Sequence, residues 1–107
     1  MPTVAEIFTD IKMRLANTSL ALSNTRAAYQ FDLSGDDGGT YHIVIDGPAG
    51  DAGPGAPENP NTTISMAASD FVALSSGQLD PTMAFMSGKL KVRGDMGLAM
   101  KLQSILR

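Results

Sequence analysis

The sequence predicts an α+β domain in which a single β-sheet is covered on one face by helices. Three observations predict it. Helical spacing of apolar residues near the N-terminus gives way to a period of two after residue 26, and helical spacing returns after residue 68. A last alternating segment then precedes an apolar helix. Because 107 residues suffice for only one modest core, we expect a single domain over residues 1–107.

The first half of the chain predicts a helix followed by a hairpin. Thr3 and Glu6 have the spacing of a capping box, so a helix should begin at Thr3 and end near Asn17. Residues 18–24 fit either a short helical turn or a loop. Alternating residues at 27–34 and 41–45 then predict two strands, joined by a glycine- and aspartate-rich turn at 35–39.

A long stretch rich in glycine and proline, Asp46 to Asn61, predicts a loop that hides at most one weak edge strand. The sheet should therefore have five strands, or four strands and a frayed edge strand. A strand at 63–66 follows, and then a helix capped by Ser69 that ends at Gly77. Asp80-Pro81 opens a second helix, which ends at Gly88. A half-buried strand at 89–93 and the Gly94-Asp95 turn lead to a last helix, from Met96 to about Leu106.

Composition excludes several classes of protein. The chain has no cysteine, which excludes disulfides, thiolate metal sites and a thiol nucleophile. No apolar run approaches the roughly 20 residues of a spanning helix. Since no charged and apolar leader opens the sequence, we expect a cytoplasmic protein. A pI near 4.8 and few aromatic residues argue against a nucleic-acid partner.

Few residues suggest catalysis. The single histidine, His42, belongs to the polar side of its strand, which predicts a surface side chain. One histidine gives no metal-binding spacing, and no phosphate-binding or nucleophile motif is present. Asp32, Asp36 and Asp37 are better explained by the hairpin turn than by a calcium loop. We therefore expect no cofactor and no metal.

The last helix has more apolar surface than one sheet contact requires. Seven of its eleven residues between Met96 and Leu106 are apolar, so a second apolar stripe must be covered by another helix, a second subunit or a ligand. The chain also has seven methionines, several of them near this helix. Methionine adapts to ligands of varied shape, although it also fills irregular cores.

The C-terminal third resembles the sterol carrier protein two family. The likeness lies in residues 65–71 (SMAASDF), 77–81 (GQLDP) and 84–103 (AFMSGKLKVRGDMGLAMKLQ). It implies a five-stranded sheet with helices that enclose an apolar tunnel for fatty acids, fatty acyl-CoA, sterols or phospholipids. It also implies a domain without enzymatic activity of its own, and it places these residues in the tunnel wall: Ile64, Met66, Phe71, Leu74, Met83, Met86, Leu90, Met96, Met100 and Gln103.

Two departures from the family pattern affect these expectations. Residues 51–55 occupy the place of the family's third strand without apolar alternation, which leaves two alternatives: a weak fifth strand at the edge, or an edge strand that is frayed or missing. The chain also ends without a peroxisomal Ser-Lys-Leu signal.

The leading hypothesis is a monomeric lipid-binding or lipid-transfer protein whose ligand is a lipid or fatty acyl group. Residues 89–107 carry a net charge of plus four against minus seven for the rest, so Lys101 and Arg107 could bring the tunnel mouth to an anionic membrane. A second hypothesis is an interaction module in which the last helix meets another subunit or a separately encoded enzyme. A third is an enzyme that uses His42, Asp95 or Gln103.

Overall fold

The computed structural model describes residues 3–17, 26–46 and 49–100. Within these ranges it has three complete helices and five strands, and residues 96–100 are also helical. In chain order the elements are α1 (Val4–Asn17), β1 (Arg26–Ser34), β2 (Gly39–Asp46), β3 (Ala49–Pro54), β4 (Thr62–Ala67), α2 (Ala68–Ser75), α3 (Pro81–Met86) and β5 (Leu90–Gly94).

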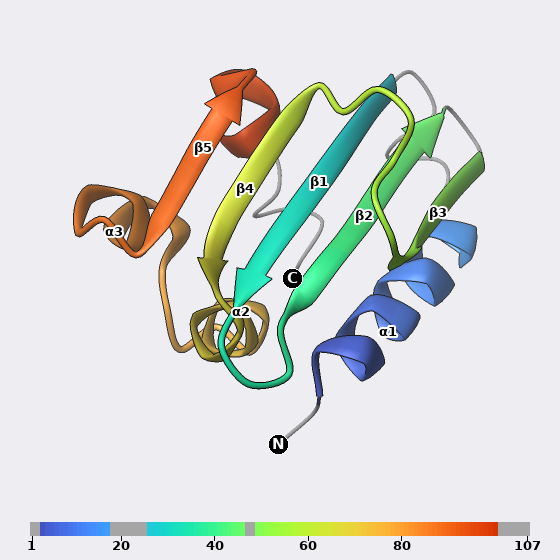
Figure 1. The fold of residues 1–107 in the computed structure, drawn as a ribbon. Coiled ribbons are helices and arrows are strands. Elements are labelled where there is room, and N and C mark those ends of the chain that lie inside the picture. The colour runs from blue at the N-terminus through green and yellow to red at the C-terminus, as the bar shows by residue number, and fades with distance from the viewer. Residues whose placement is uncertain (1–2, 18–25, 47–48, 101–107) are drawn as a thin grey trace.

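The five strands form one mixed sheet in the order β3-β2-β1-β4-β5 (Figure 1). The pair β1–β4 is parallel, whereas the other three pairs are antiparallel. Phe31 lies at the centre, opposite Tyr41 of β2 and Ile64 of β4. The predicted α+β class with a single sheet is therefore confirmed.

The core lies between one face of the sheet and the helices. Alternate residues of β1 and β4 are buried, as the period of two predicts. Phe8 of α1 stacks on Tyr41 and on Phe71 of α2, with ring centroids 4.5 and 5.1 Å apart. Phe31 meets Phe8 and Phe71 edge to face. Such geometries add to the stability gained from burial, so this aromatic layer fixes α1 and α2 on the sheet.

The predicted helix start and hairpin are confirmed. The Thr3 hydroxyl accepts from the Glu6 N–H, and the Glu6 carboxylate accepts from the Thr3 N–H, both at 3.1 Å. Asp37 in the hairpin turn accepts from the Val4 N–H at 2.8 Å, which joins the start of α1 to the turn between β1 and β2. Asp80 likewise caps α3 by accepting from the Thr82 N–H.

For the middle of the chain one expectation is confirmed and one is wrong. Of the two alternatives for the sheet, the five-stranded one is confirmed: β3 pairs with β2 along residues 49–54, and Ala52 is buried. Backbone pairing needs no apolar alternation, and the proline stands at the strand's end. Ser69 does not cap α2. The helix follows β4 without a loop, so its N-cap is Ala67, which makes no side-chain cap bond.

A corner of hydrogen bonds at Asn61 joins β1, β4 and the end of β5. The Asn61 side chain accepts from the Ala28 N–H, and its backbone N–H donates to the Ala28 carbonyl, both at 2.8 Å. Its carbonyl accepts from the Asp95 N–H at 3.1 Å. Gly94 has φ +103°, and a Cβ there would lie 2.5 Å from the Asn61 carbonyl oxygen. The chain can therefore pass this corner only with glycine at residue 94.

Substitution of Gly94 should lower the free energy of unfolding more than substitution of a glycine that is required only for its positive φ. Gly88 has φ +82°, and a Cβ added to it would meet nothing within 4 Å, so it is the matched control. We expect Gly88→Ala to lower the free energy of unfolding by about 1–2 kcal/mol and Gly94→Ala by about 3 kcal/mol or more. Urea denaturation measures both, and equal losses would contradict the role given to the corner.

Candidate functional site

The candidate site lies where the helical segment 96–100 meets the inward face of the sheet. We call this contact the terminal seam and define it by Tyr29, Thr62, Leu90, Val92 and Leu98. Tyr29, Thr62 and Leu90 are buried, while Val92 and Leu98 are partly buried and pack against the core. Hydrocarbon and aromatic surface therefore dominates the seam.

Tyr29 pins the segment to the sheet. Its side chain is fully buried, and its hydroxyl donates to the Leu98 carbonyl at 2.7 Å. Burial, together with the smaller effect of the negative charge on Asp95, raises the pKa of Tyr29 to about 12. The hydroxyl is therefore neutral at physiological pH and able to donate.

The turn before the segment sets its direction. Asp95 caps the helical segment, since its carboxylate accepts from the Leu98 N–H at 3.1 Å. This confirms the predicted start of a helix after the Gly94-Asp95 turn. The Thr62 hydroxyl donates to the Arg93 carbonyl at 3.2 Å, which ties β4 to the last residues of β5. Both polar side chains in the seam, Tyr29 and Thr62, thus have a hydrogen-bond partner.

The ten predicted lining residues fall into separate groups. Those in the sheet and α2 are buried in the core: Ile64, Met66, Phe71, Leu74 and Leu90. Of these, Phe71 is already packed between Phe8 and Phe31. Leu90, which lies on β5 opposite Met66, is the one residue of this group that also belongs to the seam.

Four of the five methionines predicted to line the tunnel face outward in the structure. Met83, Met86, Met96 and Met100 are between 42% and 76% exposed. In the short helix α3 the buried residue is Ala84, so Met83 and Met86 are not on its inward side. Gln103 lies outside the described residues. The structure therefore brings together only the strand and α2 members of the predicted set.

The sequence analysis missed Tyr29 and Thr62 as parts of the site, and Asn61 as the corner that leads the chain to it. A tyrosine in an otherwise apolar strand face carries a signal that could have identified it, because a buried phenol needs a hydrogen-bond partner. The partner itself is a backbone carbonyl 69 residues away, and no side-chain pattern reveals it.

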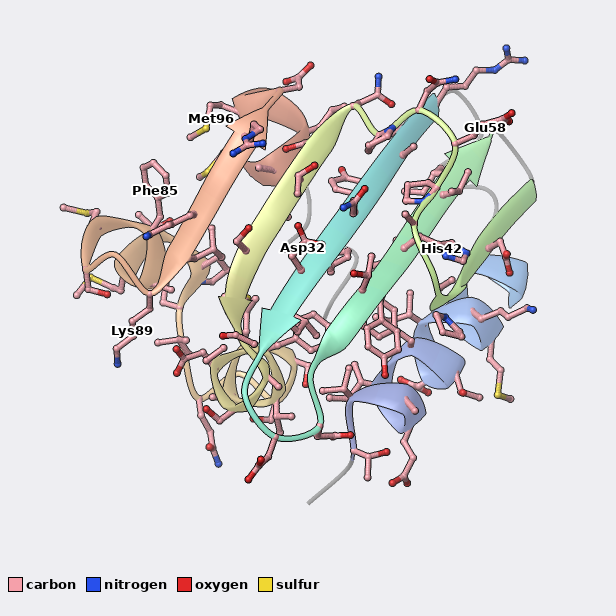
Figure 2. All side chains as sticks on the ribbon, in the orientation of Figure 1. Asp32, His42, Glu58, Phe85, Lys89 and Met96 are labelled. Atoms are coloured by element: carbon pink, nitrogen blue, oxygen red, sulfur yellow. The ribbon has the colours of Figure 1, made fainter. Side chains whose placement is uncertain are left out.

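His42 lies on the opposite, open face of the sheet (Figure 2). Its ring nitrogens lie 3.0 Å from the Gly55 carbonyl and 3.2 Å from the Asp51 carboxylate. The His42 hydrogen bond lowers the pKa of Asp51, and Lys12, 3.2 Å away, lowers it further. This cluster ties β2, β3 and α1 together, and it leaves the His42 side chain only 17% exposed, less than the predicted surface position implies.

Two residues of the enzyme hypothesis, His42 and Asp95, are not brought together, and the third, Gln103, lies outside the described residues. His42 belongs to β2 and Asp95 follows β5, with β1 and β4 between these strands. Within the described ranges no three metal-ligating side chains cluster, and no helix there has the length and hydropathy to cross a membrane.

Comparison with known proteins gives the family. Residues 8–107 match the SCP-2 sterol transfer family. The hydroxysteroid dehydrogenase-like protein 2 of Bos taurus is 44% identical over 104 residues, and that of Danio rerio is 39% identical over the same length. The matches cover 96% of this chain, but the chain spans only about a quarter of each relative.

Solved structures share the fold. The sterol carrier protein domain 2 of Helicoverpa armigera is 33% identical with a TM-score of 0.70, over 94% of this chain and 82% of that one. Palmitated SCP2L2 from Aedes aegypti is 22% identical with a TM-score of 0.78, over 99% of this chain and 96% of that one. The predicted resemblance is confirmed, and the chain belongs to the SCP-2 sterol transfer family.

Proposed function

We propose that this chain binds a fatty acid, fatty acyl-CoA, sterol or similar apolar ligand and carries it between sites. The observation that carries the proposal is the match to the SCP-2 sterol transfer family over nearly the whole chain, residues 8–107. The apolar terminal seam supports it, because ligand pockets for apolar molecules are lined mainly by hydrophobic side chains.

Palmitate is the ligand with which to test this proposal. The sterol carrier protein 2 of Aedes aegypti, solved in complex with the C16 fatty acid palmitate, shares this fold with a TM-score of 0.75 at 17% identity. The identity is too low to transfer contacts residue by residue. The shared fold does justify a saturated C16 chain as the first probe.

We place the ligand at the terminal seam, against Ile64, Met66 and Leu90. In this proposal the helical segment 96–100 forms the movable wall, since a single side-chain hydrogen bond, from Tyr29, joins it to β1. Met96 and Met100 would then line the entrance, where their flexible side chains could follow ligands of different shape. The predicted tunnel is thus a space that opens between this segment and the sheet.

The interaction module remains a second candidate. The observation in its favour is that the related dehydrogenase-like proteins are about four times as long as this chain, so in them such a domain accompanies other domains. A contact between this domain and a dehydrogenase-like enzyme is accordingly part of this second proposal. Native mass spectrometry distinguishes the two, because a lipid adduct on a monomer supports the first and a ligand-free dimer supports the second.

Contact with an anionic membrane through Lys101 and Arg107 stays a prediction, since both residues lie outside the described part of the chain. A cytoplasmic location is likewise part of the proposal.

Palmitate should raise the melting temperature in a concentration-dependent way. A ligand that binds only the folded state stabilises it by mass action, by about 2.7 kcal/mol at a concentration 100 times the Kd. For a chain of this size that corresponds to a shift of roughly 10 °C. Differential scanning calorimetry measures the shift, with butyrate as the short-chain control. An unchanged melting temperature across the palmitate series would reject the proposal.

Removal of the Tyr29 hydroxyl should weaken the terminal seam and change its alkaline stability. Between pH 10 and 12 an unfolded tyrosine ionises while folded Tyr29 keeps its proton, so the free energy of unfolding should fall by roughly 2–3 kcal/mol as the pH rises through this window. Tyr29→Phe should lower the stability at neutral pH by about 1 kcal/mol and abolish this additional alkaline loss.

Urea denaturation at pH 7, 10 and 12 tests the Tyr29 prediction. The matched control is Tyr41→Phe, which removes the other tyrosine hydroxyl of the chain and should keep the alkaline loss. A Tyr29→Phe protein with the same pH dependence as the parent would show that the hydroxyl does not hold the segment.

A further inference from the structure

The edge of the molecule formed by α3, β5 and the helical segment 96–100 gathers its exposed apolar side chains. Six large apolar side chains are exposed within the described ranges, and five of them lie here: Met83, Phe85, Met86, Met96 and Met100. The sixth, Met13, belongs to α1. Figure 2 shows Phe85 and Met96 projecting along the outer side of β5.

Cations accompany this apolar edge. Lys89 precedes β5, and Lys91 and Arg93 alternate along it with the inward Leu90 and Val92. All three cations are exposed, and no ion pair joins them to another residue of the described ranges. The edge is therefore positive on a chain whose net charge is minus three.

From this combination we propose that the α3–β5 edge docks on an anionic lipid bilayer. The inference goes beyond ligand binding and does not depend on it. Flexible methionines and an aromatic ring can enter the boundary between headgroups and acyl chains, while lysine and arginine beside them meet anionic headgroups. Both features occur on one edge here.

The same charges argue against a second copy of the chain as the occupant. A two-fold contact brings a surface against itself, so it would set Lys89, Lys91 and Arg93 of one protomer beside those of the other. Lysines on an edge strand also oppose strand pairing between chains. An anionic bilayer has the charge opposite to that of this edge. Because a bilayer has no fixed surface shape, docking on it requires no shape complementarity.

Docking at this edge would place the terminal seam next to the lipid surface. The exposed Met96 belongs to the helical segment whose Leu98 carbonyl accepts from Tyr29. A bilayer that contacts Met96 and Met100 would therefore act on the segment that closes the proposed ligand site. Exchange of ligand would then take place at the docked edge.

Flotation of the full 107-residue chain with vesicles tests the proposal. The chain should bind mixed phosphatidylcholine–phosphatidylserine vesicles more tightly than pure phosphatidylcholine vesicles, and binding should weaken as salt is added. Lys89→Gln with Lys91→Gln should lower the partition coefficient about 25-fold, at about fivefold per cation. The charge-retaining pair Lys89→Arg with Lys91→Arg should bind as the parent does.

The role of the exposed apolar side chains in docking is tested separately, with its own control. Phe85→Ser should weaken binding to the mixed vesicles, whereas Met13→Ser, which alters an even more exposed side chain on α1, should not. Equal binding by the parent and the Lys→Gln pair, or equal losses for Phe85→Ser and Met13→Ser, would overturn the proposal. A dimer in analytical ultracentrifugation that Phe85→Ser abolishes would assign the edge to a second copy and overturn it too.

The melting-temperature shift by palmitate separates this proposal from the proposed function. The Lys89→Gln with Lys91→Gln variant should keep that shift while losing vesicle binding. Loss of both the melting-temperature shift and vesicle binding would show that the substitutions damage the fold at β5. The comparison of Phe85→Ser with Met13→Ser then decides whether the edge docks on the bilayer.

Discussion

The arrangement of the candidate site depends on the hydrogen bond from the Tyr29 hydroxyl to the Leu98 carbonyl. A phenol buried among apolar side chains must find an acceptor, and in this chain the acceptor lies on the helical segment after β5. The bond fixes that segment over the sheet at the β1–β4 junction. The corner at Asn61 and Gly94 brings the chain to this place, and Asp95 starts the helix there.

The two ends of the sheet are held by different physical means. At α1 and α2 the space above the sheet is filled by stacked rings of Phe8, Tyr41 and Phe71, which leave little freedom. At the terminal seam the contacts are the aliphatic side chains of Leu90, Val92 and Leu98, the Tyr29 ring and the hydroxyl bonds of Tyr29 and Thr62. A ligand that must enter and leave is better accommodated where aliphatic side chains, rather than a layer of stacked rings, meet the sheet. This difference is the structural reason for placing the ligand beside β5.

Local signals in the sequence predicted most elements because each depends on neighbouring residues. The capping box at Thr3, the cap at Asp80 and the alternation of Leu90 and Val92 are all of this kind. The sequence left β3 as one of two alternatives because backbone pairing with β2 and the cover of α1 create this strand, and neither leaves a side-chain pattern. Tyr29 as an anchor and the outward position of Met83 depend on tertiary contacts, which a local pattern does not contain.

In the function that we propose, an apolar ligand binds between the helical segment 96–100 and the sheet. Methionine methyl groups report on it directly, because Met66 lies inside, Met96 lies on the segment and Met13 lies at the opposite side on α1. In methyl-labelled NMR spectra, palmitate should shift the Met66 and Met96 signals and give them nuclear Overhauser contacts with the acyl chain, and it should leave Met13 unchanged. Contacts with Met13 instead, or no change at Met66 and Met96, would contradict the account.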